Sequence, residues 1–307
     1  MVKGEGSIMR DRATSNKIKD STLERFFDVV NIIFLMLVML VILLPVLHIL
    51  FASFSDPVEV MRQKGFILRP LGFTLDSYKS VAKNPNIVSG YTNTIFIVVF
   101  GTALNIFLTL IAAYVISRKD FMWSTLITIL IIITLYFDGG IIPFYLTVRN
   151  VKLDGSIWAL IIPSAINTFN LIIMRTAMVG VPESMSESAK IDGAGHFRIL
   201  FSIMVPLVKS TIAVLTLYYA VSHWNSWFNA MIFLRDRKLY PLQLILREIL
   251  IQGDTTMMTA GSGEDIAMIG ETIKYATIVV ATIPVLCVYP FLQRYFVKGV
   301  LIGAVKG

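Results

Sequence analysis

The sequence holds few of the residues from which disulfide frameworks, metal sites and charged soluble surfaces are built. It has one cysteine, Cys287, in an apolar stretch, and three scattered histidines, His48, His196 and His223. A single cysteine excludes a disulfide scaffold, and histidines so far apart do not indicate a zinc site. Charged residues make up 15% of the 307 residues, whereas an ordinary soluble domain has about 25%.

Motifs for chemistry are absent as well. The chain has no Gly-x-x-x-x-Gly-Lys-Ser/Thr segment for binding ATP, and it has no evident Ser-His-Asp set or pair of carboxylates. We therefore expect no catalytic residue, no metal and no cofactor in this chain, and we predict that it is not an enzyme by itself.

What the sequence has in abundance is apolar residues. They make up 56% of the chain, and the mean hydropathy is +0.74. A soluble globule could not coat so much apolar surface with so few charges, so composition predicts an all-α, polytopic membrane protein. The net charge of +7 fits basic residues that flank membrane spans and contact anionic lipid, and we expect no nucleic-acid partner.

Six apolar runs are long enough to cross a bilayer, which needs about 20 residues. They lie at about residues 29–54, 88–116, 121–148, 157–179, 206–233 and 272–297. No small-residue cleavage site follows the first run, which indicates a retained span rather than a signal peptide. The predicted organisation is thus an N-terminal tail at 1–26 and a transmembrane domain at 27–307.

Orientation follows from lysine and arginine. The tail before the first span is basic, and positive segments favour the cytoplasmic side. We therefore predict that both termini are cytoplasmic, that 56–87 and 235–270 are outer loops, and that 180–205 is a cytoplasmic loop. The basic residues of the tail are Lys3, Arg10, Arg12, Lys17, Lys19 and Arg25.

The loop at 180–205 carries the most information. Pro182 suits a helix start, and Ser184 with Glu187 three residues later predicts a capping box. A short helix to about Asp192 is then expected to break at Gly193, and a second amphipathic piece leads to Pro206. Two short ordered helices with a hinge between them indicate a docking site.

This loop resembles the EAA loop of binding-protein-dependent ABC importer permeases. The residues that match the pattern are Glu187, Ser188, Ala189, Asp192, Gly193, Ala194, Ile203 and Pro206. Ser188 replaces the first alanine of that pattern, a change of one small residue for another. Three further segments are similar to the carbohydrate branch of the family, in its maltose-type second subunit: Phe137–Pro143, His223–Asn229 and Gln293–Gly307.

The resemblance implies a type I ABC importer permease fold and a permease subunit of a carbohydrate importer, with an oligosaccharide as substrate. It implies residence in the bacterial cytoplasmic membrane beside a second, homologous permease subunit. Its other implied partners are an extracytoplasmic sugar-binding protein and an ATPase subunit dimer, which holds the ATP and Mg. The loop would dock in a cleft of the ATPase, with Glu187 facing basic groups there and Gly193 allowing the bend. Two alternatives stay open: Glu187 serves only the capping box, and Gly193 only ends the helix.

Polar and aromatic residues at membrane depth are candidates for the substrate pathway, because buried polar groups in a bilayer often line one. Those on the fifth run are Tyr218, Tyr219, His223, Trp224, Asn225, Trp227 and Asn229, and those elsewhere are Asn93, Asn105 and Asp138. The alternative for the tryptophans is an interfacial aromatic belt. Asp138, beside two glycines, marks either a broken helix that lines a cavity or a simple turn.

The second outer loop is rich in glycine and short polar residues, which suit insertion into a polar sugar cleft. By resemblance, it is expected to reach the sugar-binding protein; the alternative is a flexible connector. The candidate contact residues are Met257, Gly261, Ser262, Gly263 and Glu264.

Two other functions compete with import driven by a partner ATPase. A self-contained secondary transporter or channel would suit a broken third span with an acidic residue, but the sequence shows no internal repeat. An intramembrane enzyme lacks a catalytic set.

Overall fold

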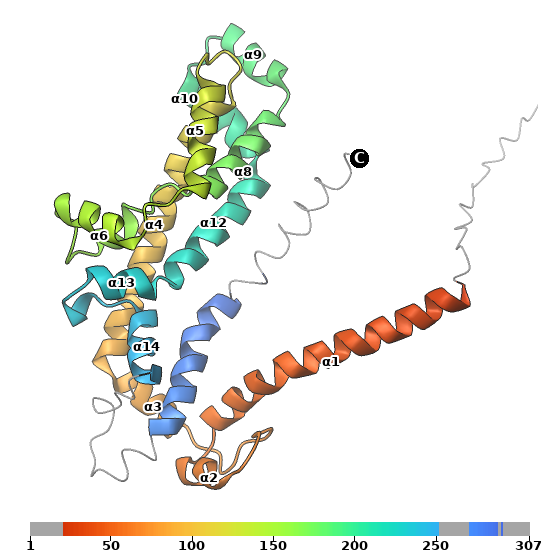
Figure 1. Cartoon of the computed structure of the whole chain (residues 1–307), viewed down its shortest axis with the longest axis vertical. Helices are drawn as coiled ribbons and strands as arrows, with labels where there is room; N and C mark the ends of the chain where they lie inside the picture. Colours follow the sequence, from red (N-terminus) through yellow and green to blue (C-terminus); the bar gives the residue numbers. More distant parts are fainter. Residues whose placement is uncertain (1–20, 252–269, 288–289, 291–307) are drawn as a thin grey trace, which may run out of the picture.

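The computed structural model describes residues 21–251, 270–287 and 290, and helices account for the regular structure in these ranges (Figure 1). No strand occurs in the described part of the chain. The predicted all-α class is confirmed.

Three described helices are long and apolar enough to cross a membrane: α1 (Thr22–Ser53), α4 (Pro85–Ser117) and Gly270–Cys287. Helix α1 begins inside the segment predicted as a tail, because Ser21 and Glu24 form a capping box there. In Figure 1, α1 diverges from the other helices and approaches them only near its C-terminal end.

The third predicted span is not one helix. Helices α5 (Ser124–Tyr136) and α6 (Ile141–Asn150) meet at an angle of 117°. Gly140 takes a φ of +79°, which favours glycine, and its N–H donates to Asp138 Oδ1 at 2.6 Å. A local turn therefore breaks the apolar run.

The fourth and fifth predicted spans are interrupted as well. The fourth divides into α7 (Trp158–Ile161) and α8 (Thr168–Val179), and Pro163 lies in the break. In the fifth, α12 (Lys209–Trp224) makes an angle of 87° with the segment His196–Leu207. Helix α12 ends before α13 (Trp227–Phe233), so more than one helix covers the span predicted at 206–233.

Within the described residues, the three long helices and the two bent pairs give up to five spans by length and composition. Helix α8 has 12 residues, fewer than the about 20 needed for a straight crossing. The count of six spans stays a prediction.

The segments between spans are also helical. The predicted outer loop 56–87 contains α2 (Pro57–Arg62) and α3 (Asp76–Lys83), and the loop after α13 contains a 3-10 turn (Arg237–Leu239) and α14 (Leu242–Ile251). The predicted loop 180–205 contains α9 (Glu183–Ile191), α10 (His196–Ile199) and a π-helical turn (Leu200–Met204), followed by α11 (Val205–Leu207). Figure 1 places α9 and α10 at the opposite end of the molecule from α2 and α3.

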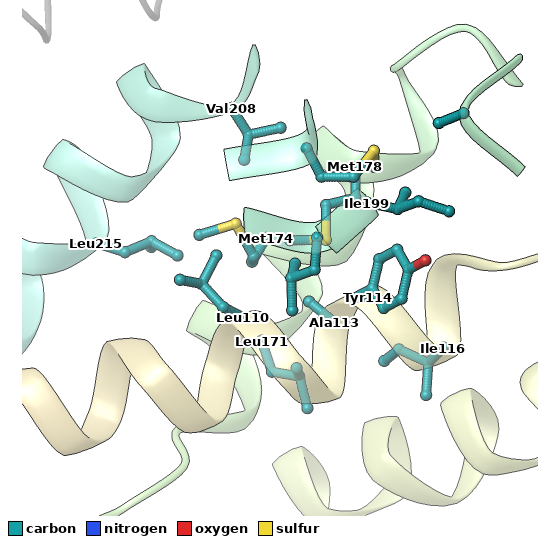
Figure 2. Close-up of a cluster of buried hydrophobic side chains, with 13 residues drawn as sticks. Leu110, Ala113, Tyr114, Ile116, Leu171, Met174, Met178, Ile199, Val208 and Leu215 are labelled. Carbon is teal, nitrogen blue, oxygen red and sulfur yellow. The ribbon is translucent and has the colours of Figure 1, made fainter. Parts of the chain in front are cut away.

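A buried apolar cluster fixes the end of the molecule that carries α9 (Figure 2). Helix α4 contributes Leu110, Ala113 and Tyr114, and α8 contributes Leu171 and Met174. The i, i+3 and i+4 spacing places these side chains on one face of each helix. Ile199 and Leu215 complete the contact from α10 and α12, so the two short helices rest on the ends of α4, α8 and α12.

Candidate coupling surface and ligand cavity

Nearby residues in the sequence set both ends of helix α9. It starts at Glu183, with Pro182 as the N-cap, and no side chain caps its first turn. The predicted capping box of Ser184 and Glu187 is therefore wrong, because proline starts the helix earlier and leaves Ser184 inside the first turn.

Gly193 ends α9 in a left-handed conformation, with a φ of +76°. The N–H of Gly193 donates to the Lys190 carbonyl at 3.0 Å, and the N–H of Ala194 donates to the Ala189 carbonyl at 2.9 Å. These two bonds form a Schellman motif, in which glycine is favoured at this position. The predicted bend between the two short helices is thus present and depends on one backbone angle.

The EAA-like residues divide into a buried and an exposed set. Ala189 is buried, and Ala194 packs against the same apolar cluster, so these two anchor the loop. Glu187, Ser188 and Asp192 are exposed. The exposed set can meet another molecule without disturbing the fold.

The short connection between α4 and α5 holds α9 through two ion pairs. Lys119 Nζ lies 2.6 Å from Glu183 Oε2, and Lys190 Nζ lies 3.1 Å from Asp120 Oδ2. Arg118 pairs with Asp120 as well. Exposed pairs contribute little individually, but this set joins the connection to both ends of α9. The charged run at 118–120 is the only sequence signal of this contact, and its pairing with α9 was not predicted.

These pairs shift the pKa values of Lys119 and Asp120. The Glu183 carboxylate raises the pKa of Lys119. The Arg118 guanidinium, more than the Lys190 ammonium, holds the pKa of Asp120 well below its ordinary value. Lys119 and Asp120 therefore stay charged across the physiological pH range.

After Gly193 the chain returns to the membrane through an irregular helix. The Val205 N–H bonds to the Leu200 carbonyl, which closes the π-helical turn, and Pro206 lies in the first turn of α11. Proline cannot supply the next helical N–H, which explains the displaced bonding pattern. Ser186 Oγ lies 3.9 Å from Met204 Sδ, so α9 touches this turn directly.

A cavity of 820 Å³ lies beside α9, between it, the connection at 117–125 and the end of α8. Glu187 and Lys190 line it together with Arg118, Lys119 and Arg175. Its wall carries both signs of charge among apolar side chains.

A second cavity, of 470 Å³, lies between α8 and α12. Three of the predicted pathway residues, Tyr218, Tyr219 and His223, line it. The sequence analysis missed the other polar groups there, which include Ser164, Asn167, Asn170 and Ser222. Single amides and hydroxyls in apolar runs gave no pattern that joined them.

Buried hydrogen bonds fix the walls of this cavity. His223 Nε2 lies 2.6 Å from Asn105 Oδ1, and the Asn105 amide donates to the Ser164 carbonyl. The Tyr219 hydroxyl lies 2.8 Å from Thr109 Oγ1 and accepts the Asn167 N–H at 3.2 Å. Asn105, Tyr219 and His223 are therefore positioning residues, which hold the break between α7 and α8 against α4 and α12.

The remaining pathway candidates do not line this cavity. Asn93 donates to the carbonyls of Lys238 and Tyr240, and Asp138 caps its own turn. Trp224 packs edge-on against Tyr91, and Trp227 lies under the Arg247 guanidinium. Asn225 donates to the carbonyl of its own helix, and Asn229 is half-buried on α13.

The predicted contacts with a sugar-binding protein lie outside the described residues and stay predictions; they are Met257, Gly261, Ser262, Gly263 and Glu264. In the described part of the chain, no group of three histidine, cysteine, aspartate or glutamate side chains is placed to hold a metal.

Comparison with known proteins bears on what these surfaces serve. A scan against models of protein families gives no match. Over 288 residues the chain is 43% identical to the polygalacturonan/rhamnogalacturonan transport system permease protein YtcP of Bacillus subtilis, covering 92% of this chain and 99% of that one. It is 42% identical to the protein LplC of the same organism, over 92% of this chain and 96% of that one.

Among solved structures, a chain of a bacterial ABC transporter involved in the import of the acidic polysaccharide alginate superposes with a TM-score of 0.83. The sequence identity is 31%, and the match covers 90% of this chain and 99% of that chain. Full-length similarity in both sequence and fold shows that the chain belongs to the family of carbohydrate ABC importer permeases, the membrane-embedded translocation subunits of these transporters.

Proposed function

We propose that this chain is one of two permease subunits of an ATP-driven importer for oligosaccharides of acidic polysaccharides. The observation that carries the proposal is the 43% identity, over nearly the whole of both chains, to a permease for polygalacturonan and rhamnogalacturonan. The structural similarity to a chain of an alginate importer supports the same substrate class.

The coupling step is proposed for the exposed residues of α9 and its Gly193 turn. Glu187, Ser188 and Asp192 would contact an ATPase dimer in the cytoplasm, while Ala189 and Ala194 transmit its movement to the cluster shared by α4 and α8. ATP and Mg belong to that partner, and hydrolysis takes place there. With the six predicted spans, this arrangement would place both termini of the chain in the cytoplasm.

The remaining partners complete the transport path. A second, homologous permease subunit would form the other wall of the pathway, and an extracytoplasmic sugar-binding protein would deliver the oligosaccharide to the outer loops. The sugar-binding protein would contact the segment between α14 and the last described helix.

A secondary transporter is the weaker candidate. It would use Asp138 at the broken third span to bind a coupling ion, yet the Asp138 carboxylate accepts a hydrogen bond from the Gly140 N–H and forms part of a local turn. A secondary transporter has no cytoplasmic partner, so this alternative does not account for the ion-paired, ordered helix α9.

The test is uptake by the complete complex in proteoliposomes. Oligogalacturonides and a neutral maltooligosaccharide are supplied with the binding protein outside and ATP inside. We expect uptake of the oligogalacturonide that requires both ATP and the binding protein. Uptake of the neutral sugar alone would contradict the substrate class, and uptake without the ATPase would contradict the coupling.

A further inference from the structure

The cavity between α8 and α12 has the properties of a small-molecule site rather than of a packing gap. Its 470 Å³ falls within the range of ligand pockets, roughly 300–1,000 Å³. Aromatic rings of Phe169 and Tyr218 stand among its amides and hydroxyls. No lysine, arginine, aspartate or glutamate belongs to the described residues that line it.

Asn170 is the feature that points to a ligand. The residue is 6% exposed and lines the cavity. Its backbone N–H bonds to Asn167 Oδ1 at 3.1 Å, but its side-chain amide has no hydrogen-bond partner in the described part of the molecule. The amide is not among the fully buried atoms without a partner in the described residues, so its two donors and its acceptor are open to a partner in the cavity.

The wall around Asn170 is already held in place. Asn105 and His223 join α4 to α12 and to the Ser164 carbonyl, and Tyr219 holds the Asn167 N–H. A ligand that binds Asn170 therefore meets a preorganised surface and orders few groups on binding, which favours affinity.

We propose that this cavity binds an uncharged, hydroxyl-bearing edge of the transported oligosaccharide, with the Asn170 amide as its main hydrogen-bonding group. The inference rests on the proposed sugar-import function and adds a contact site within it. Sugar hydroxyls both donate and accept, as an amide does, and the apolar face of a sugar ring suits the rings of Tyr218 and Phe169. A carboxylate would find no cation here, so the acidic groups of the substrate lie outside this subsite.

Replacing Asn170 by leucine tests the proposal in the complete importer. Uptake of oligogalacturonide should fall about tenfold, the factor that corresponds to ~1.4 kcal/mol and to the loss of one or two hydrogen bonds. The melting temperature of the complex should not fall, because the Asn170 amide makes no hydrogen bond in the described part of the molecule that its replacement would break. The matched control is Thr176→Val on the same helix, whose hydroxyl bonds only within α8, and it should transport as the wild type does.

Unchanged uptake by Asn170→Leu, beside wild-type uptake, would overturn the subsite and leave the proposed function standing. Absence of uptake by the wild type would contradict the proposed function and this inference with it. A fall in both melting temperature and uptake would show that Asn170 is structural.

A second measurement does not depend on Asn170. In a Cys287→Ser background, Ser222→Cys places a thiol in the cavity for a neutral methanethiosulfonate reagent. Oligogalacturonide with the binding protein should slow this modification severalfold. Equal rates with and without sugar would show that the cavity holds water and not substrate.

Discussion

Replacing Gly193 by alanine should weaken coupling between ATP hydrolysis and transport by distorting the turn after α9. Gly193 has a φ of +76°, and a Cβ built there meets no atom within 4 Å. The cost of a side chain is therefore backbone strain alone. An L-residue in this region costs about 1–2 kcal/mol, and the β-branched Gly193→Val should cost more.

That cost is large for a turn held by two hydrogen bonds, to the carbonyls of Lys190 and Ala189. A shift of 1–2 kcal/mol changes the population of the bent turn by about five- to thirtyfold. If docking needs the bent turn, uptake per ATP hydrolysed should fall by a similar factor in a variant whose turn is no longer mostly bent.

The assay is oligosaccharide uptake and ATPase activity of the reconstituted complex, measured on the same preparation. Gly195→Ala is the matched control, because Gly195 has a φ of −71° and its Cβ would also meet nothing within 4 Å. Gly193→Asn should retain part of the coupling, since asparagine tolerates a positive φ. Wild-type coupling in Gly193→Val would refute the reasoning.

Other changes separate the coupling surface from the membrane core. Glu187→Lys should abolish sugar-dependent ATP hydrolysis while the complex still assembles, since reversed charge at a desolvated contact can cost several kcal/mol; normal activity would remove Glu187 from the contact. Gly101→Ala should lower the thermal stability by roughly 1–3 kcal/mol, because its Cβ would lie 2.6 Å from His223 Nε2; an unchanged melting curve would show that the ring yields freely. The pKa of Asp120 is lowered, so its ion pairs contribute stability above the unfolded-state pKa and lose that contribution only in acid. Coupling should therefore not change from pH 6 to 8 through this group. Asp120→Asn should weaken coupling at neutral pH. Replacing residues 257–264 by a Gly-Ser linker of equal length should slow uptake and leave basal ATPase activity unchanged. Uptake equal to that of the wild type at every sugar concentration would show that the segment is only a connector.

The conformation of the loop at 180–205 could be predicted from sequence because its signals are local. A proline, a glycine that adopts a positive φ and the spacing of apolar residues fix two short helices and the bend between them. The capping box failed for a local reason too, because Pro182 starts the helix before Ser184 can cap it.

The spans were harder to predict, because hydropathy measures solvent preference and not helix continuity. Residues 157–179 are apolar enough for one span, yet Pro163 and the buried contacts of Asn105 and Tyr219 hold a break between two helices there. These contacts come from helices distant in sequence.

The ligand cavity shows the same limit. Tyr218 and His223 stood out as polar residues in an apolar run, whereas Asn170 and Ser222 meet them only through the packing of α8 on α12. No spacing in the sequence joins these two helices, so the unpaired amide of Asn170 becomes visible only in the structure.

The central claim is that this permease moves an oligosaccharide at the expense of ATP hydrolysed by a partner. Labelled oligogalacturonide uptake should be measured in proteoliposomes that hold the complete complex, with ATP inside, with an inactive ATPase, and with an imposed proton or sodium gradient alone. The account predicts uptake in the first condition and none in the other two. Uptake that follows the ion gradient and persists with the inactive ATPase would contradict it.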